Sequence, residues 1–126
     1  MTIEQLLNKG ADTLRKAGVS EYRLDAWYLL SYYMNIGKNE YYKNPYALVS
    51  DAQVTEYESL ISERAKRKPL QYITGEQEFA GLIFNVNENV LIPRQDTEVI
   101  VELVIKHAKS KRVLDMCTGS GCIAVS

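Results

Sequence analysis

The sequence predicts an α+β protein with two domains: a helical bundle over residues 1–73, a linking β-hairpin over 74–94, and the opening of an α/β domain over 95–126. Three observations predict this class. Apolar residues recur at a helical period through the first half of the chain, and their spacing becomes typical of strands afterwards. A short apolar segment then leads into a glycine-rich turn and a helix start, the order found at the opening of a βαβ unit.

Two helices of the first half are expected to begin at capping boxes. Thr2 with Gln5, and Ser50 with Gln53, have the spacing at which each side chain bonds the other residue's backbone N–H. Gly18 stands where a glycine commonly follows a helix, so the first helix is expected to end there. Apolar residues form one stripe behind each box: Ile3, Leu6, Leu7, Leu14 and Ala17, then Val54, Tyr57, Leu60, Ile61 and Ala65.

Shorter segments complete the expected bundle. Ser20 is expected to cap a second helix, which Asn35 and Gly37 end. A short helix is expected over 39–43. Pro69 either ends the helix before it or opens a short successor that runs through residue 73. The bundle would therefore contain about four or five helices.

The second half is expected to form a hairpin and a helix. The apolar spacing predicts one strand over 79–86 and another over 90–92, with residues 87–89 as the turn. Asp96 or Thr97 is then expected to cap a helix that ends in basic residues, which suit the negative end of the helix dipole. His107, the single histidine, belongs to that basic end, so we interpret it as structural.

The glycine turn is the most informative feature of the sequence. A short buried strand is expected over 112–116, and the turn at residues 118–121 leads into a helix that begins at Cys122. Glycines let the backbone turn tightly and approach a ligand, and the helix start offers unpaired N–H groups to an anionic group. The Gly-x-Gly-x-x-Ala pattern fits a nucleotide-type ligand and a tight turn without a ligand equally well.

Asp115 precedes this turn, at the carboxyl end of the expected strand, where open α/β sheets bind their ligands. A carboxylate there suits a cationic group, such as the amino group of adenosylmethionine, better than a pyrophosphate. The same residue type also organises turns by side-chain hydrogen bonds. The residues alone leave both interpretations open.

Composition excludes several classes of function. The 126 residues are 46% hydrophobic and 25% charged, with a net charge of −1, which argues against disorder and against a strongly basic nucleic-acid-binding face. No apolar segment is long enough to span a membrane, and the first residues do not form a signal peptide. Cys117 and Cys122 are too few for a disulfide framework and are not spaced as zinc ligands, so we expect a reduced, cytoplasmic protein without a metal.

Three segments in combination resemble the peptide-chain release-factor glutamine methyltransferases, the HemK-like family. They are Pro-Leu-Gln-Tyr-Ile-Thr-Gly at 69–75, followed by Phe79; Val-Leu-Ile-Pro-Arg-Gln-Asp-Thr-Glu at 90–98; and Val-Leu-Asp-Met-Cys-Thr-Gly-Ser-Gly at 113–121. The resemblance runs from about residue 70 to the end of the chain, and the helical half resembles the family more loosely. The glycine loop alone is shared by most adenosylmethionine-dependent methyltransferases.

The resemblance implies a helical N-terminal domain that recognises release factors, joined by a β-hairpin to a Rossmann-like methyltransferase domain. The methyl donor would be S-adenosylmethionine. The acceptor would be the side-chain amide nitrogen of the glutamine in the Gly-Gly-Gln motif of class-one translation release factors. The donor-binding residues would be Asp115, Cys117, Thr118, Gly119, Ser120 and Gly121. Most relatives have glycine where Cys117 stands, so its side chain must point away from the donor.

The family's Asn-Pro-Pro-Tyr motif, which holds the acceptor amide, does not occur in this sequence. We therefore expect the chain to be the N-terminal portion of such an enzyme, monomeric, without catalytic residues of its own and inactive by itself. Arg94 follows Pro93 at the junction of hairpin and helix. We expect it to help shape the active site of the full enzyme, through a carboxylate such as Glu98.

Two features and two other functions stay open. The basic residues at 64–68 suit either an acidic partner surface or a solvated helix end. The tyrosines fit either core packing or a partner-binding patch: Tyr28, Tyr32, Tyr33, Tyr41, Tyr42 and Tyr46. An adenine amino-methyltransferase acting on DNA or RNA would use the same donor loop, although the near-neutral charge argues against it. A non-catalytic helical interaction module is the other alternative.

Overall fold

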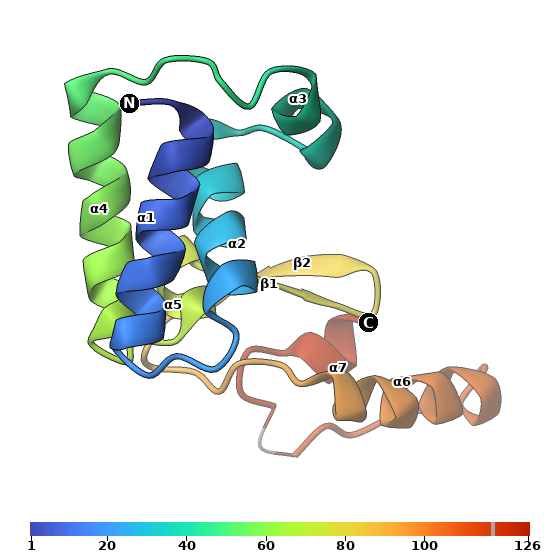
Figure 1. The fold of residues 1–126 in the computed structure, drawn as a ribbon. Helices are drawn as coiled ribbons and strands as arrows, with labels where there is room; N and C mark the ends of the chain where they lie inside the picture. Colours follow the sequence, from blue (N-terminus) through green and yellow to red (C-terminus); the bar gives the residue numbers. More distant parts are fainter. Residues whose placement is uncertain (117) are drawn as a thin grey trace. The chain divides into compact units, whose positions relative to one another are not determined.

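The computed structural model describes residues 1–116 and 118–126. The chain divides into two compact units, Met1–Thr74 and Gly75–Ser126 (Figure 1). The first unit contains helices α1 to α5, and the second contains strands β1 and β2 with helices α6 and α7. A helical bundle followed by a small β-hairpin is the fold class that the sequence predicts, and that prediction is confirmed.

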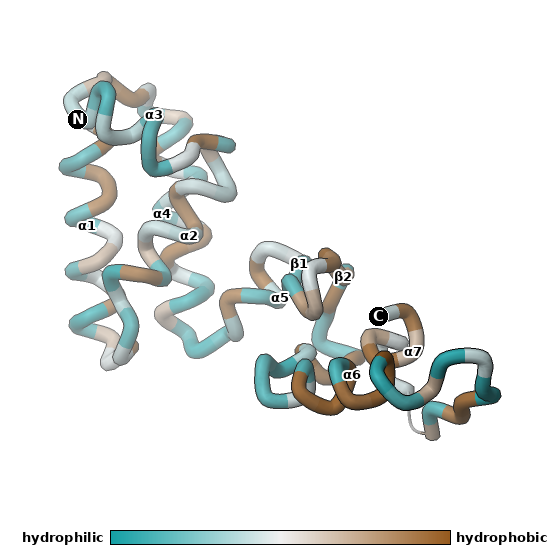
Figure 2. The backbone as a smooth tube through the Cα atoms, turned by 90° about the vertical axis from the view of Figure 1, so that its right-hand side faces the viewer, coloured by the Kyte–Doolittle hydropathy of each residue, from teal (hydrophilic) through white to brown (hydrophobic). Residues whose placement is uncertain are grey.

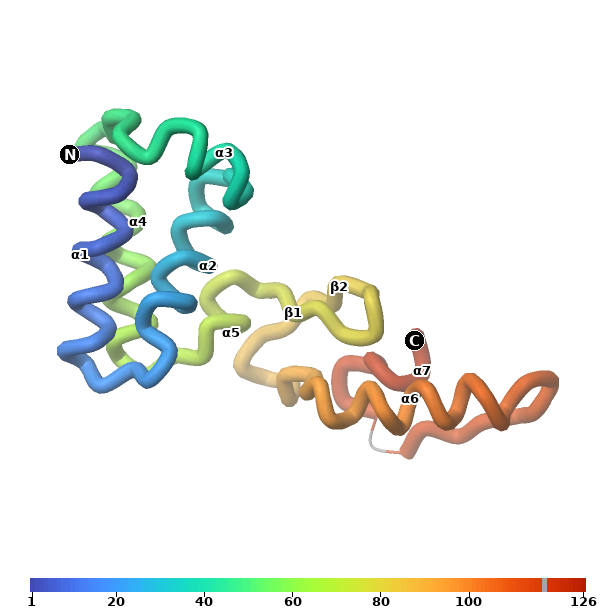
Figure 3. Tube along the Cα trace, turned by 45° about the vertical axis from the view of Figure 1, so that its right-hand side comes forward, coloured from blue at the N-terminus to red at the C-terminus, as the bar shows by residue number. Residues whose placement is uncertain are grey.

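Three long helices form the first unit. They are α1 (Ile3–Lys16), α2 (Tyr22–Met34) and α4 (Asp51–Ala65), which pack side by side (Figures 1 and 3). The short helix α3 (Lys38–Lys43) lies in the connection between α2 and α4, at the end of the bundle where the chain begins. Helix α5 (Leu70–Thr74) packs against α2 and α4 at the opposite end.

The apolar stripes of these helices meet in one core. Leu6 and Leu14 from α1 and Leu29 and Leu30 from α2 are fully buried, and Tyr57 from α4 lies among them. Burying a leucine or a comparable side chain contributes roughly 1.5–3 kcal/mol relative to leaving it in water, so these positions hold the bundle together. The spacing of about 3.6 residues is what brings them to one face of each helix.

Both predicted capping boxes are confirmed. The N–H of Thr2 donates to Gln5 Oε1 at 3.0 Å and the N–H of Gln5 to Thr2 Oγ1 at 3.2 Å. Ser50 and Gln53 repeat the pattern at 2.9 and 3.2 Å. Each box satisfies donors that the first turn of a helix leaves without an intrahelical partner.

The second helix does not begin as predicted. Ser20 is not its cap: Glu21 is the N-cap residue, and no side chain caps this end. The reason lies one residue earlier, where Val19 is buried and its N–H donates to the carbonyl of Leu14 at 3.0 Å. Burial of Val19 fixes the turn after α1, so that the chain enters the helix one position later than the sequence suggested. The end of the helix agrees with the prediction, because Asn35 closes it in a left-handed conformation.

The second unit contains a β-hairpin, placed earlier than predicted. Strand β1 (Glu76–Phe79) pairs antiparallel with β2 (Leu82–Asn85), with Glu76 opposite Asn85 and Phe79 opposite Leu82. The sequence-based strands over 79–86 and 90–92 are therefore wrong. Ala80 and Gly81 adopt φ values of 50° and 78°, which places a tight two-residue turn inside the segment interpreted as one strand.

Helix α6 (Gln95–His107) follows the hairpin, and its cap also differs from the prediction. Arg94 is the N-cap residue, in place of Asp96 or Thr97. The N–H of Thr97 donates to the carbonyl of Arg94 at 3.0 Å, so the first turn already closes there. Asp96 and Glu98 lie in that first turn, where negative side chains suit the helix dipole.

Residues 112–116 do not form the predicted strand, and β1–β2 is the only sheet in the described residues. A parallel strand needs a neighbour to satisfy its backbone N–H and C=O groups, and the described residues offer none. The side chains of Val113, Leu114 and Met116 are accordingly exposed.

Helix α7 (Cys122–Val125) begins where the sequence predicted it. No helix in the described part of the chain is both long and apolar enough to cross a bilayer.

Candidate functional site

The glycine loop lies between residues 112–116 and α7. Gly119 and Gly121 have φ values of 60° and 78°, and Gly121 is the N-cap residue of α7. Residues with a side chain rarely adopt this left-handed backbone conformation, so the loop requires glycine at both positions. Ser120 stands between them, half-buried. Cys117, the remaining predicted loop residue, lies outside the described residues.

Asp115 and Thr118 close the loop with a hydrogen bond. The hydroxyl of Thr118 donates to Asp115 Oδ2 at 2.8 Å, and the N–H of Gly121 donates to the carbonyl of Thr118 at 3.0 Å. One carboxylate oxygen of Asp115 thus organises the turn. Its other oxygen, Oδ1, accepts no hydrogen bond from the described residues. The structure supports the interpretation of Asp115 as a residue that organises the turn, and a contact with a ligand stays a prediction.

A hollow of about 820 Å³ adjoins the glycine loop. Side chains from α6, residues 112–116 and α7 line it, including Val101, Leu114 and Ile123, and Asp115 lies at its wall. Figure 2 shows the apolar residues along α6. Ligand pockets commonly measure roughly 300–1,000 Å³ and combine apolar walls with a few polar groups, which describes this hollow.

Arg94 and Glu98 both lie at the start of α6, and the role expected for them in the full enzyme stays a prediction. Glu98 Oε1 accepts a hydrogen bond from the backbone N–H of Ala80 at 2.9 Å, which ties α6 to the hairpin turn. Arg94 is exposed at the start of α6, and no ion pair joins it to Glu98 in the described structure. Nothing in the local sequence signals the contact of Glu98, because its partner lies 18 residues away in the chain.

Two of the basic residues at 64–68, Arg64 and Arg67, form bonds that hold the helical unit together. Arg64 Nε donates to Asp25 Oδ2 at 2.9 Å in an ion pair that is largely buried, and a guanidinium nitrogen of Arg67 donates to the carbonyl of Ala17 at 3.2 Å. These bonds join the end of α4 to α2 and to the end of α1. Sequence reasoning missed the pair of Asp25 and Arg64, because its members lie on different helices.

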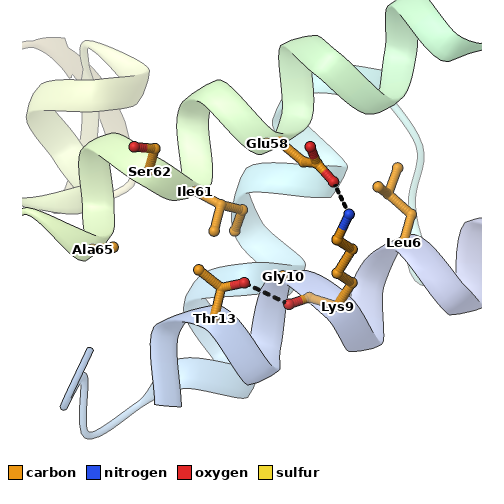
Figure 4. A pocket seen from close by; sticks show the side chains of 8 residues that line it. All are labelled: Leu6, Lys9, Gly10, Thr13, Glu58, Ile61, Ser62 and Ala65. Atoms are coloured by element: carbon orange, nitrogen blue, oxygen red, sulfur yellow. Dashed lines mark hydrogen bonds and ion pairs between the residues drawn. The ribbon is translucent and has the colours of Figure 1, made fainter. Parts of the chain in front are cut away.

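The groove between α1 and α4 is a packing contact (Figure 4). Lys9 and Glu58 form an ion pair across it, and the hydroxyl of Thr13 bonds the carbonyl of Lys9 at 3.0 Å. A Cβ atom on Gly10 would lie 2.5 Å from the hydroxyl oxygen of Tyr57, so glycine permits the close approach of the two helices. The two charges neutralise each other, and the groove offers no unpaired charged group to a ligand.

The tyrosines divide between the two interpretations. Tyr28, Tyr32, Tyr42 and Tyr46 are exposed to about half or more of their surface, whereas Tyr33 and Tyr41 are half-buried. Burial raises the pKa of the Tyr41 phenol, with a further contribution from the nearby carboxylate of Glu4. His107 is exposed in the last turn of α6, next to Lys106. In the described residues no group of acidic, histidine and cysteine side chains could hold a metal.

Comparison with known proteins identifies the family of the helical unit. The family model described as PrmC N-terminal domain matches residues 5–75, more than half of the chain. The chain belongs to this family. The PrmC N-terminal domain therefore corresponds to helices α1 to α5, and the match ends at the start of the hairpin.

Curated relatives extend the similarity past the PrmC N-terminal domain. The release factor glutamine methyltransferases of Leptospira interrogans and Geobacter sulfurreducens are each 43% identical to this chain over 99% of it. The same enzyme of Clostridium botulinum is 36% identical over the whole chain. The chain spans 44–46% of the length of these three relatives.

Proposed function

We propose that the full-length protein methylates the side-chain amide nitrogen of the glutamine in the Gly-Gly-Gln motif of class-one release factors, with S-adenosylmethionine as the methyl donor. One observation carries the proposal. Identity of 43% to a release factor glutamine methyltransferase extends over 99% of this chain, so it includes the helical unit and the glycine loop together. The whole-chain similarity favours this acceptor over an adenine amino group, and an enzyme over a separate interaction module.

In this proposal the glycine loop binds the donor. Gly119 and Gly121 let the backbone of residues 118–121 approach the ligand closely. Asp115 Oδ1 accepts a hydrogen bond from the donor's amino group, while Oδ2 keeps its bond to Thr118. Ser120 and Cys117 complete the loop on the strength of the resemblance alone. Arg94 contributes to the active-site wall, and Glu98 supports it indirectly by holding the hairpin turn against α6.

The acceptor chemistry belongs to residues that this sequence does not contain. An amide nitrogen is a poor nucleophile, so an enzyme must hold the NH₂ group and align it with the sulfonium methyl group. This chain has no Asn-Pro-Pro-Tyr motif for that task. Its proposed roles are donor binding by the loop and release-factor recognition by the helical unit. We expect the enzyme to act as a cytoplasmic monomer, without direct contact to nucleic acid.

The direct test incubates the full-length protein with S-adenosylmethionine and a class-one release factor, followed by mass spectrometry of the Gly-Gly-Gln peptide. One methyl group on the glutamine is the expected product. A release factor with alanine in place of that glutamine is the acceptor control and should stay unmodified. Methylation of DNA or RNA adenine instead, or no methylation of any of these acceptors, would contradict the proposal.

Two glycine variants of the full-length protein test the loop itself. Gly119→Val places a β-branched side chain where φ is 60°, so the loop must rearrange and donor binding should fall by at least about tenfold. Gly37→Val is the matched control, because a Cβ atom there meets nothing within 4 Å and φ is negative. Equal donor affinity in the two variants would exclude the loop as the binding site.

A further inference from the structure

Helix α2 has apolar side chains on two opposite sides. Ala26, Leu29 and Leu30 are buried in the core of the bundle. On the other side, Leu24, Tyr28 and Tyr32 follow one another at intervals of four residues and are exposed to 42%, 49% and 50%. A helix that is apolar all round is normally buried all round, so this exposed stripe indicates a surface that a partner covers.

The stripe leads into a hollow of about 350 Å³ between α1, α2 and α3. We name this hollow the aromatic groove; its walls include Leu7, Leu24, Trp27, Tyr41 and Tyr42, together with Arg23 and Lys38. Its volume is at the lower end of the roughly 300–1,000 Å³ of ligand pockets, enough for one large side chain. Two of the tyrosines for which the sequence left both interpretations open, Tyr41 and Tyr42, thus line a groove, together with residues that the tyrosines alone did not indicate.

The aromatic rings of the groove are held by one another. The ring centroids of Trp27 and Tyr41 are 5.4 Å apart at 62°, and those of Tyr41 and Tyr42 are 5.3 Å apart at 63°. These edge-to-face pairs hold the three rings against one another; Trp27 and Tyr41 are half-buried, and Tyr42 is 71% exposed. Rigid, exposed aromatic side chains lose little conformational freedom on binding, which is why they commonly anchor protein interfaces.

The charges around the groove are positive and unpaired. Arg23 and Lys38 form no ion pair within the described residues, and no carboxylate lines the groove. Glu40, on the same helix as Tyr41 and Tyr42, accepts a hydrogen bond from the N–H of Gly37 at 3.0 Å, and the charge of Glu4 contributes to the raised pKa of Tyr41. Arg23 lies over the ring of Tyr22, with its guanidinium carbon 5.9 Å from the ring centroid. The groove therefore presents an apolar floor and two cations that have no carboxylate partner in the described residues.

We propose that the aromatic groove binds an acidic peptide segment of a protein partner, with one aromatic or branched apolar side chain of that segment inserted beside Trp27. Carboxylates on either side of the anchor pair with Arg23 and Lys38. Single-stranded RNA, the other ligand of surfaces with aromatic and basic residues, fits less well. Aliphatic side chains of Leu7 and Leu24 line the groove, and the chain's net charge of −1 gives little attraction for phosphates.

This inference does not depend on methyl transfer, because every residue of the groove belongs to the helical unit. It is tested with the 126-residue chain and a synthetic peptide that carries one phenylalanine between aspartate and glutamate residues. Trp27 is the only tryptophan of the protein, so its fluorescence reports directly on the groove. A saturable shift of Trp27 emission, weakened by added salt, is the expected result.

Peptide and protein controls separate the contribution of the charges to binding from that of the apolar anchor. A peptide with lysine in place of the acidic residues, and one with glycine in place of phenylalanine, should each bind at least about tenfold more weakly. The variant with both Arg23→Glu and Lys38→Glu should lose affinity to a similar extent, as should Tyr42→Ala. Lys66→Glu, which reverses one exposed charge outside the groove, should not alter binding, whereas Lys38→Glu alone, a reversal of the same size at the groove, should weaken it.

Three outcomes would overturn the proposal. They are an unchanged Trp27 emission, equal affinity for the acidic and the basic peptide, and stronger binding of a single-stranded RNA oligonucleotide than of the acidic peptide. Circular dichroism of each variant checks that the helical unit is folded. The charge variants are exposed substitutions, so they remain informative even if Tyr42→Ala is destabilised.

Discussion

Tyr57 joins the three long helices at a single point. Its side chain is fully buried, its hydroxyl donates to the carbonyl of Ala26 on α2 at 2.9 Å, and its ring lies against Gly10 of α1. Burial raises the pKa of this phenol above its ordinary value of 10.0, because the phenolate form would lose its hydration. The sequence placed Tyr57 on the apolar stripe of α4, and nothing local indicated its hydrogen bond.

The raised pKa of Tyr57 makes stability depend on pH under alkaline conditions. Above pH 10.0 the unfolded chain loses the phenol proton while the folded chain keeps it, so the free energy of unfolding falls as the pH rises. The contribution is fully present below that pH. Urea unfolding measured at several pH values from about 8 to 11 should show this decline in the wild-type protein and a smaller decline in Tyr57→Phe.

At neutral pH the same variant should be less stable by about 1 kcal/mol, the contribution of one hydrogen bond. Tyr28→Phe is the control, because the side chain of Tyr28 is half exposed, whereas that of Tyr57 is fully buried. A decline of equal size in the wild-type protein and in Tyr57→Phe would show that other groups cause the alkaline loss of stability.

Single residues show which site features a sequence can reveal. Gly119 and Gly121 could be recognised as turn glycines because their spacing is local, and both adopt the left-handed conformation. The hydrogen bond of Thr118 to Asp115 also joins neighbours in the chain. The pair of Asp25 and Arg64 spans two helices and depends on how the bundle packs, so no sequence pattern of either helix contains it.

At the scale of elements, the helices with capping boxes are the most predictable part of the fold. Their signals lie within four residues, so local sequence determines them. The hairpin was misplaced because alternation of apolar residues continues through Ala80 and Gly81, where the chain turns. The strand expected over 112–116 failed for another reason: an apolar pattern predicts a buried strand only when neighbouring strands are present to pair with it.

The capping boxes give the second prediction. Thr2→Ala and Ser50→Ala each remove the side-chain acceptor that bonds the third residue of a helix, at 3.2 Å in both cases. Each variant should lose about 1 kcal/mol of unfolding free energy in urea denaturation. Thr55→Ala is the control, because its hydroxyl bonds the carbonyl of Asp51 inside α4, at 2.9 Å, and caps no helix end. Losses no larger than that of the control would contradict the proposed role of the boxes.

At the scale of the molecule, the two units differ in what they bury. The core cluster of the first unit draws on α1, α2 and α4, whereas the buried apolar side chains described in the second unit are those of Phe79, Val86, Pro93 and Val101. Helix α6 leaves Val99, Ile100, Leu103 and Ile105 exposed. Because apolar burial is the main favourable term in folding, the first unit alone has a core sufficient for independent stability.

The third prediction follows from this difference. A chain of residues 1–74 should be helical by circular dichroism and unfold in one cooperative thermal transition, at nearly the same midpoint as the first unit within the 126-residue chain. A chain of residues 75–126 should show no cooperative transition. Absence of a transition in residues 1–74 would mean that the helical unit needs the rest of the chain to fold.

The sequence reveals the glycine loop, but the described residues contain no neighbouring strand that would hold the loop in place. The loop and Asp115 are present, yet residues 112–116 pair with no described strand, and α7 has only 4 residues. An isolated helix in water is marginal below about 12–15 residues. The methyl donor should therefore require sheet neighbours that the full-length protein supplies and the described residues do not.

Isothermal titration with S-adenosylmethionine tests this central claim most directly, with the 126-residue chain and the full-length protein measured side by side. The full-length protein should bind the donor with a dissociation constant in the micromolar range, and Gly119→Val should abolish that binding. The 126-residue chain should give no measurable heat of binding beyond dilution. Micromolar binding by the 126-residue chain would contradict the account, because it would show that the loop holds the donor without a surrounding sheet.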